Sequence, residues 1–187
     1  WAIWRLEKEQ RLRDDEGSGI NAASLFAAMT RQVPADAAMC VDVGNNTYSF
    51  GRYFEVTDQD VLMSGYLGSI GFAFPAARGV GAAVGADRAV VSVSGDGGFG
   101  QYAMEFTTAV KYDMNITHVL MNNSELGKIS KEQRSAAFDV WQTELVNPDF
   151  AAYAELCGGQ GIRVTDAADL DDALARALAH EGPSLVE

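Results

Sequence analysis

Two short apolar runs, each followed by a polar residue, most constrain what this chain can fold into. The runs occupy residues 89–93 and 117–121; Asp96 follows the first, and Asn123 follows the second, 27 positions after Asp96. Runs that are apolar throughout are typical of strands buried on both faces of a parallel sheet. Because the carboxyl ends of parallel strands lie at one edge of the sheet, we expect Asp96 and Asn123 to meet there.

A carboxylate and a carboxamide at such an edge can hold a hard cation. Magnesium prefers six oxygen ligands and usually keeps phosphate and water among them. Asp96 would supply charge, Asn123 a neutral oxygen, and the Glu125 backbone carbonyl a third protein ligand. The alternative reading is that Asp96 and Asn123 are ordinary turn residues, since Asp-Gly and Asn pairs are common after strands. The spacing favours a site for magnesium and a diphosphate.

The rest of the chain repeats the alternation of strand and helix. Further strand-like runs and helical patterns follow one another along the sequence, and the pattern at 170–180 is clearly amphipathic. The predicted strands are 38–43, 61–64, 89–94, 117–121, 161–164 and 184–186; the predicted helices are 72–84, 101–111, 150–156, 170–180 and one that Asn21 caps and that ends at Val33. The pattern predicts an α/β domain with a doubly wound, mostly parallel sheet and helices on both faces.

The chain divides into a lead-in and one domain. Residues 1–19 are highly charged and end in Gly17-Ser18-Gly19, which predicts an exposed helix running into a flexible joint. Residues 20–187 form the predicted domain. Because the chain does not begin with Met, we expect it to be part of a longer protein, with the lead-in linking to a preceding domain.

The charge balance excludes several classes of partner. The net charge is −12, from 26 acidic and 14 basic residues, which argues against a nucleic-acid or anionic-membrane surface. No apolar run approaches the ~18 residues of a membrane span, and no secretory signal is visible. We therefore expect a cytoplasmic protein. An anionic cofactor would need backbone amides and a metal to bind to such an acidic chain.

Two familiar nucleotide motifs do not fit. Residues 95–100 match Gly-x-Gly-x-x-Gly, but they follow the third predicted strand, and no acidic residue closes a strand about 20 positions later. No Gly-Lys-Ser/Thr loop is present. His118 lies inside a predicted strand, and His180 ends a helix, so neither is a candidate catalyst. Glycines instead mark the predicted strand ends, and Gly97 and Gly98 precede a helix whose N–H groups would favour phosphate.

The motifs at 95–97 and 122–123 resemble a known signature. A Gly-Asp-Gly followed 27 positions after the Asp by the second Asn of a pair is similar to the thiamine-diphosphate signature of the pyruvate oxidase and acetohydroxyacid synthase superfamily. The resemblance covers residues 21–187 and corresponds to the diphosphate-binding domain, the last of three in those enzymes. It implies that Asp96, Asn123 and the Glu125 carbonyl bind magnesium, and that Ile70 bends the cofactor.

The resemblance implies a wider set of cofactor contacts, with no catalytic residue in this chain. The implied contacts are Gly44, Asn45, Asn46, Gly68, Ser69, Ile70, Gly95, Asp96, Gly97, Gly98, Asn123, Glu125, Leu126 and Gly127. In the family, the activating glutamate lies on a pyrimidine-binding domain of a neighbouring subunit, and FAD, where used, lies mainly on a middle domain. We therefore expect the isolated chain to be inactive and the parent protein to be a homodimer or homotetramer.

Within the superfamily, the motifs are most similar to pyruvate oxidase and pyruvate:quinone oxidoreductase. The segments that carry this likeness are 42–44, 95–99, 122–127, 129–133 and 182–186. The implied activity is decarboxylation of a 2-oxo acid, pyruvate first, with oxidation through FAD in the full-length protein. A carboligase such as acetohydroxyacid synthase, a simple decarboxylase and a non-catalytic module remain alternatives. Lys128 and the pair Asn45-Asn46 depart from the family pattern.

Overall fold

The computed structural model describes residues 2–14 and 19–187, and its centre is a six-stranded parallel sheet. The strand order is β2-β1-β3-β4-β6-β5, and every neighbouring pair is parallel. The strands are β1 (Ala38–Val41), β2 (Asp60–Met63), β3 (Val90–Gly95), β4 (Ile116–Met121), β5 (Gln160–Ile162) and β6 (Ser184–Val186). Each overlaps a predicted run, so the predicted doubly wound α/β fold is confirmed.

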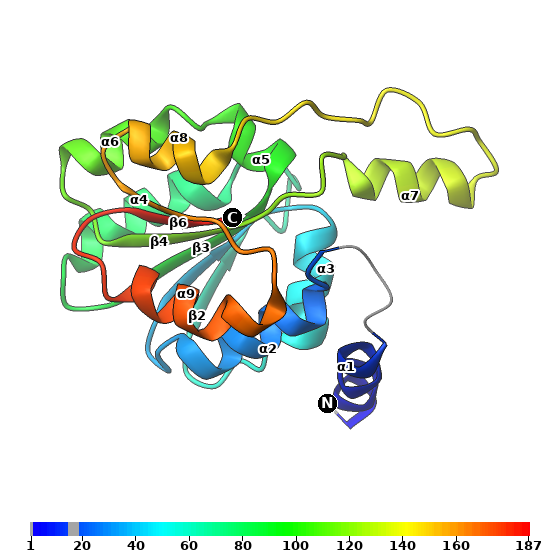
Figure 1. Ribbon diagram of the computed structural model, residues 1–187, viewed down its shortest axis with the longest axis horizontal. Helices are drawn as coiled ribbons and strands as arrows, with labels where there is room; N and C mark the ends of the chain where they lie inside the picture. The colour runs from blue at the N-terminus through cyan, green and yellow to red at the C-terminus, as the bar shows by residue number, and fades with distance from the viewer. Residues whose placement is uncertain (1, 15–18) are drawn as a thin grey trace.

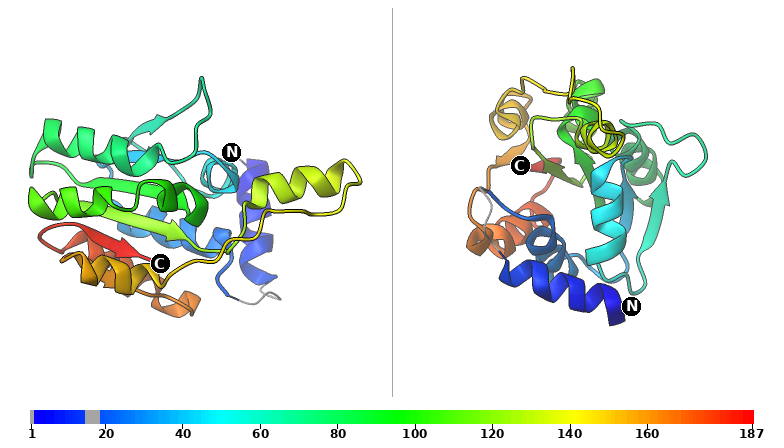
Figure 2. Two further views of the ribbon diagram at one scale, coloured as in Figure 1. Left: turned by 90° about the horizontal axis from the view of Figure 1, so that it is seen from above. Right: turned by 90° about the vertical axis from the view of Figure 1, so that its right-hand side faces the viewer.

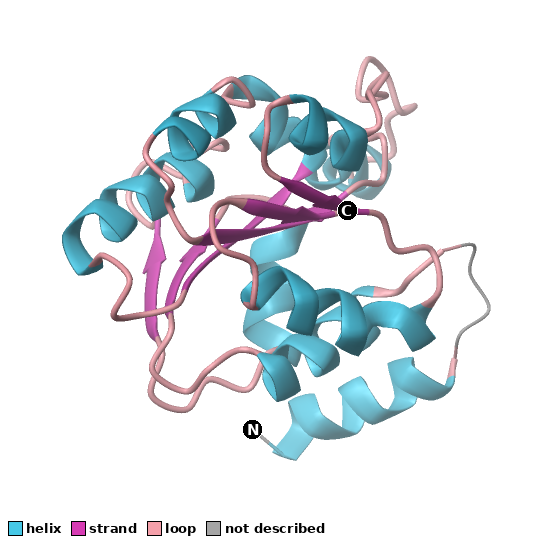
Figure 3. Cartoon of the chain, turned by 60° about the vertical axis from the view of Figure 1, so that its left-hand side comes forward, coloured by secondary structure: helices cyan, strands magenta, loops and turns pink. Residues whose placement is uncertain are grey.

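Helices cover both faces of the sheet (Figures 1 and 3). One layer holds α2 (Ala22–Gln32), α3 (Asn45–Tyr53), the short 3₁₀ turn η1 (Ala167–Asp169) and α9 (Leu170–Leu178). The other layer holds α4 (Ala73–Val84), α5 (Asp96–Gln101), α6 (Glu105–Lys111) and α8 (Phe150–Leu156). Side chains alternate along β3 between these two cores: Val91 and Val93 enter the first, whereas Val90 enters the second.

Two helices lie outside these layers. The lead-in helix α1 (Ala2–Arg13) packs beside α2 and α3, where Arg5 and Lys8 both bind the carboxylate of Glu55. Helix α7 (Gly127–Ser135) projects from the carboxyl edge, and the chain returns beside it (Figure 2). The predicted lead-in helix is thus confirmed, whereas Gly17 and Ser18 of the predicted joint lie outside the described residues. No helix in the described ranges is long and apolar enough to cross a membrane.

The structure differs from the predicted helices in three places, and Gly97 and Gly98, predicted to precede a helix, lie inside α5. The segment predicted as one helix at 101–111 belongs to two helices. Helix α5 begins at Asp96 and ends at Gln101, and α6 begins at Glu105. Helices α3 and α7 were not predicted. The α3 sequence contains Gly51 and several residues of low helix propensity. In α7 only Ser130 is buried, so this helix has no apolar face that a periodic pattern could reveal.

His118 is a satisfied core residue, as its place in the predicted strand indicates. The side chain is fully buried in β4; its Nδ1 lies 2.6 Å from Ser92 Oγ and its Nε2 lies 3.1 Å from Ser94 Oγ. The ring stacks on Phe99 at a centroid distance of 4.6 Å. Burial disfavours the charged imidazolium and lowers the pKa of His118 from 6.5 to about 3.

The depressed pKa of His118 predicts a pH-dependent loss of stability. Below pH 6.5 the unfolded chain binds a proton that the folded chain does not accept until about pH 3. The free energy of unfolding should therefore fall on acidification by up to about 1.4 kcal/mol per pH unit from this residue alone. Urea unfolding of the chain and of its His118→Gln variant between pH 7 and pH 4 would measure this, since the carboxylates contribute equally to both. Parallel stability curves would contradict the prediction.

Candidate functional site

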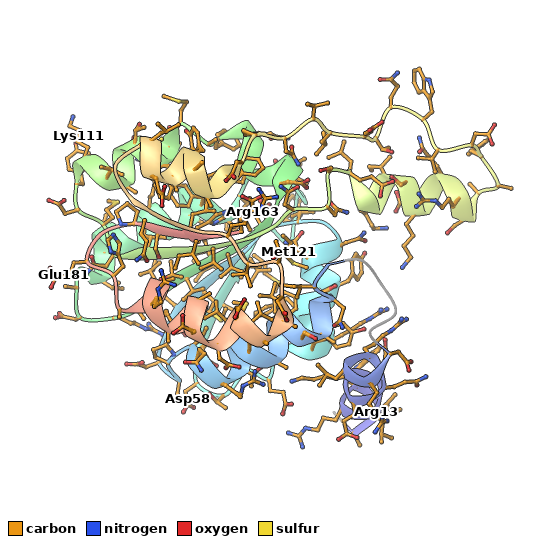
Figure 4. The ribbon with its side chains drawn as sticks, in the orientation of Figure 1. Arg13, Asp58, Lys111, Met121, Arg163 and Glu181 are labelled. Atoms are coloured by element: carbon orange, nitrogen blue, oxygen red, sulfur yellow. The ribbon has the colours of Figure 1, made fainter. Side chains whose placement is uncertain are left out.

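A cavity of about 660 Å³ opens at the carboxyl edge of the sheet. The connection that leaves β1 leads to β2, on one side of β1. The connection that leaves β3, on the other side of β1, leads away to β4. The loops that leave β1 and β3 therefore diverge and leave a crevice, which is where open parallel sheets bind ligands. Two of the lining residues, Met121 and Arg163, are labelled in Figure 4 on the side of the sheet where the strands end.

The cavity gathers nearly all the residues that the sequence analysis selected. Its lining includes Gly44, Asn45, Asn46, Gly68, Ile70, Gly95, Asp96, Gly97, Gly98, Asn123, Glu125, Leu126 and Gly127. Ser69 is the exception: it is exposed, is not part of the lining, and its hydroxyl donates to the backbone carbonyl of Ile70 at 3.3 Å. The structure thus brings together segments that follow β1, β2, β3 and β4.

Helices α3 and α5 both begin at residues that line this cavity, and each follows a glycine, Gly44 or Gly95, which has no side chain to cap it. Helix α3 begins at Asn45, after Gly44, whose φ of 133° is a conformation that side chains rarely allow. Helix α5 begins at Asp96, directly after β3. The first N–H groups of a helix have no partner within the helix and carry the positive end of its dipole. Both ends can therefore favour an anion, and in α5 the Gly97 N–H already donates to the Asp96 carboxylate.

Two glycines of the cavity, Gly97 and Gly127, lie close to neighbouring side chains. A Cβ atom on Gly97 would lie 2.6 Å from Leu126 Cδ2. A Cβ atom on Gly127 would lie 2.9 Å from Asn45 Nδ2 and 3.1 Å from Asn123 Nδ2. A side chain at either position would therefore require Leu126, Asn45 or Asn123 to shift.

Asp96 presents a buried carboxylate at the end of β3. The side chain is 2 % exposed; its Oδ1 accepts a hydrogen bond from Gly97 N at 2.9 Å, and its Oδ2 accepts one from Ser124 N at 2.7 Å. Asn123 follows β4 and is exposed to the cavity. The Glu125 carbonyl accepts from Gly127 N at 2.8 Å and retains a second lone pair. This set of one carboxylate, one carboxamide and one carbonyl suits a hard cation that takes further oxygens from phosphate.

Asp42 has a structural role that the sequence analysis did not identify. The carboxylate is 1 % exposed and accepts hydrogen bonds from Val43 N at 2.8 Å, Gly71 N at 3.0 Å and Phe72 N at 3.2 Å. Burial raises the pKa of Asp42, and these backbone donors oppose the increase. Its backbone carbonyl accepts from Asn46 Nδ2 at 2.8 Å. Asp42 therefore joins the end of β1 to the segment that carries Ile70 and to the start of α3.

Other residues at the site were also missed. Asn147 donates to Asp96 Oδ2 at 2.6 Å, and Glu187 Oε1 accepts from Asn122 Nδ2 at 2.8 Å. The sequence offered one signal for Asn147: the Asn-Pro-Asp run at 147–149 is typical of the start of a helix, and it directly precedes the predicted helix at 150–156. Lys128 lines the cavity, pairs with Glu132, and has its Nζ 5.4 Å from the centroid of the Tyr48 ring.

Comparisons with known proteins agree with this geometry. Residues 42–187 match the family described as thiamine pyrophosphate enzyme, C-terminal TPP binding domain. The Bacillus subtilis (strain 168) protein YdaP, provisionally named as thiamine pyrophosphate-containing, is 39 % identical over 87 % of this chain and 28 % of its own length. The catabolic acetolactate synthase of Raoultella terrigena is 31 % identical over 96 % of this chain and 33 % of its own length.

A solved structure extends the comparison to three dimensions. The thiamine diphosphate-dependent 4-hydroxybenzoylformate decarboxylase of Rhodococcus jostii RHA1 aligns with a TM-score of 0.83 and 26 % sequence identity. The alignment covers 91 % of this chain and 32 % of that protein. The chain therefore spans about a third of the length of the relatives it matches.

The contacts of Asp42 predict a large effect of removing its carboxylate. Asp42→Ala would leave the buried N–H group of Gly71 and the partly buried N–H group of Phe72 without this acceptor, so we expect a loss of about 3 kcal/mol in the free energy of unfolding. The matched variant Asp58→Ala, at an exposed position, should change it by no more than about 0.5 kcal/mol. Urea unfolding of both variants would measure the difference. Equal stability of the two variants would exclude the structural role of Asp42.

Proposed function

The chain belongs to the thiamine pyrophosphate enzymes, as their C-terminal TPP-binding domain, and from this membership we propose that its cavity holds the diphosphate of thiamine diphosphate together with a magnesium ion. One observation carries the proposal: Asp96 and Asn123 line the same cavity as the uncapped starts of α3 and α5. The cavity thereby offers acidic and amide oxygens for a cation together with N–H groups for a phosphate.

Each part of the site has a distinct role in this proposal. Asp96, Asn123 and the Glu125 carbonyl would hold magnesium, and the N–H groups at the starts of α3 and α5 would hold the diphosphate. Ile70, half-buried in the cavity wall, would support the ring portion of the cofactor. When bound, thiamine diphosphate supplies the electron sink for decarboxylation of a 2-oxo acid. The chain supplies binding and orientation, and we propose that the activating glutamate lies on another domain.

For the whole protein we propose decarboxylation of a 2-oxo acid, with pyruvate as the substrate. The motif likeness to pyruvate oxidase favours oxidation of the product through FAD. The acetolactate synthases among the relatives favour transfer to a second carbonyl compound instead. A non-catalytic module is the weakest alternative, because the proposed metal ligands Asp96, Asn123 and Glu125 are all present at one cavity. We further propose that the pyrimidine-binding domain of a partner subunit completes the site.

Removal of the Asp96 charge tests the cofactor proposal directly. Asp96→Asn keeps the shape of the side chain but removes the carboxylate that would bind magnesium. We expect it to weaken magnesium-dependent binding of thiamine diphosphate on the order of 100-fold or more. Asp87→Asn, at an exposed position, is the matched control and should leave binding unchanged. Isothermal titration calorimetry on the intact protein that carries this chain would measure both variants. Unaltered binding by Asp96→Asn would reject the proposed site.

The fate of pyruvate tests the activity. We expect the intact protein, loaded with magnesium, thiamine diphosphate and FAD, to release carbon dioxide from pyruvate, and the isolated 187-residue chain to release none. Bleaching of the flavin absorbance under anaerobic conditions would identify an oxidase. Acetolactate with an unchanged flavin band would identify a carboligase, and acetaldehyde would identify a simple decarboxylase. Absence of carbon dioxide from the loaded protein would contradict the proposed activity.

A further inference from the structure

The two oxygens of the Asp96 carboxylate carry unequal numbers of hydrogen bonds. Oδ2 accepts two, from Ser124 N at 2.7 Å and from Asn147 Nδ2 at 2.6 Å. Oδ1 accepts one, from the adjacent Gly97 N at 2.9 Å. Because each carboxylate oxygen offers about two lone-pair sites, Oδ2 is filled by the protein, whereas Oδ1 can still accept a ligand.

Asn147 is itself held in a network that fixes its orientation. Its Nδ2 donates to Asn122 Oδ1 at 2.9 Å as well as to Asp96 Oδ2, so both acceptors require the amide nitrogen at the same place. Asn122 Nδ2 in turn donates to Glu187 Oε1, and Glu187 Oε2 accepts from Ala151 N at 3.0 Å, in the first turn of α8. The network therefore ties Asp96 to the start of α8.

The backbone next to Asn147 is also fixed. Leu145 N donates to Ser124 O at 2.8 Å, and Leu126 N donates to Thr143 O at 2.8 Å. These two bonds close the base of the projecting arm, which we define as residues 127–146. Asn147 directly follows the arm, so its side chain reaches Asp96 from a backbone that is already anchored beside Ser124. A positioning group must be held in this way if it is to orient a ligand.

We propose that Asn147 is the positioning residue for the metal ligand Asp96: it occupies Oδ2 and thereby leaves Oδ1 as the oxygen that binds magnesium. This inference rests on the proposed function of the cavity. Partners that orient a metal-binding carboxylate raise metal affinity without touching the metal, and their removal typically weakens binding about 10- to 100-fold. Asn147 acts through Asp96 and is not itself a ligand.

Magnesium affinity of the intact protein tests the proposal without a measurement of activity. Magnesium is titrated by calorimetry at saturating thiamine diphosphate into the wild-type protein, Asn147→Ala and Asn115→Ala. Asn115 is the matched control: its side chain accepts from Gly182 N at 2.7 Å, and it lies directly before β4, at the opposite edge of the sheet. We expect the magnesium Kd to rise about 10- to 100-fold in Asn147→Ala and less than about 2-fold in Asn115→Ala.

A second variant covers the case in which Asn147→Ala does not fold. Asn147→Ser keeps a polar side chain that is too short to reach Asp96, and it should weaken magnesium binding to a similar extent. Either folded variant with wild-type magnesium affinity would overturn the role of Asn147 while leaving the proposed function intact. If the wild-type protein bound no thiamine diphosphate in the presence of magnesium, the proposed function and this inference would both be rejected.

Discussion

The carboxyl edge of the sheet depends on two buried carboxylates that must find hydrogen-bond donors. Asp42 follows β1 and Asp96 follows β3, and neither is more than 2 % exposed. Removal of a charged carboxylate from water is costly unless backbone or side-chain donors replace the lost hydration. The donors come from distant segments, Gly71 and Phe72 for Asp42 and Ser124 and Asn147 for Asp96. Satisfying these two groups therefore positions the loops that form the cavity.

The same edge resolves an apparent conflict between the charge of the chain and the charge of its proposed ligand. A net charge of −12 disfavours a diphosphate at long range. Within the cavity, however, the uncapped starts of α3 and α5 present N–H groups and the positive ends of two helix dipoles. A cation held beside Asp96 would offset the remaining charge. Affinity for an anion is then a local property of strand ends, and the acidic surface elsewhere does not determine it.

Sequence patterns predicted the strands and the residues at their ends, because both depend on short stretches of sequence. The six strands were found because they are short and apolar, and the placement of Asp96 and Asn123 at one cavity follows from parallel strand order. Helix α7 was missed because only one of its residues is buried, and α3 because its sequence favours no helix on its own. The contact between Asp96 and Asn147 joins residues 51 positions apart, and Asn147 lies in the stretch between α7 and α8, which contains no helix or strand. No periodicity in the sequence records such a contact, so only the folded chain shows it.

The three residues that follow β4 show how one turn can serve both scaffold and ligand. Asn122 and Asn123 both line the cavity, and the Asn122 side chain also joins the network with Asn147 and Glu187. Ser124 has a φ of 54°, an uncommon value for a residue with a side chain, and its N–H reaches Asp96 Oδ2. Strain of this kind persists only where surrounding contacts enforce it. Here the hydrogen bond to a buried carboxylate is such a contact, and the turn that satisfies Asp96 is the same turn that places Asn123 in the lining of the cavity.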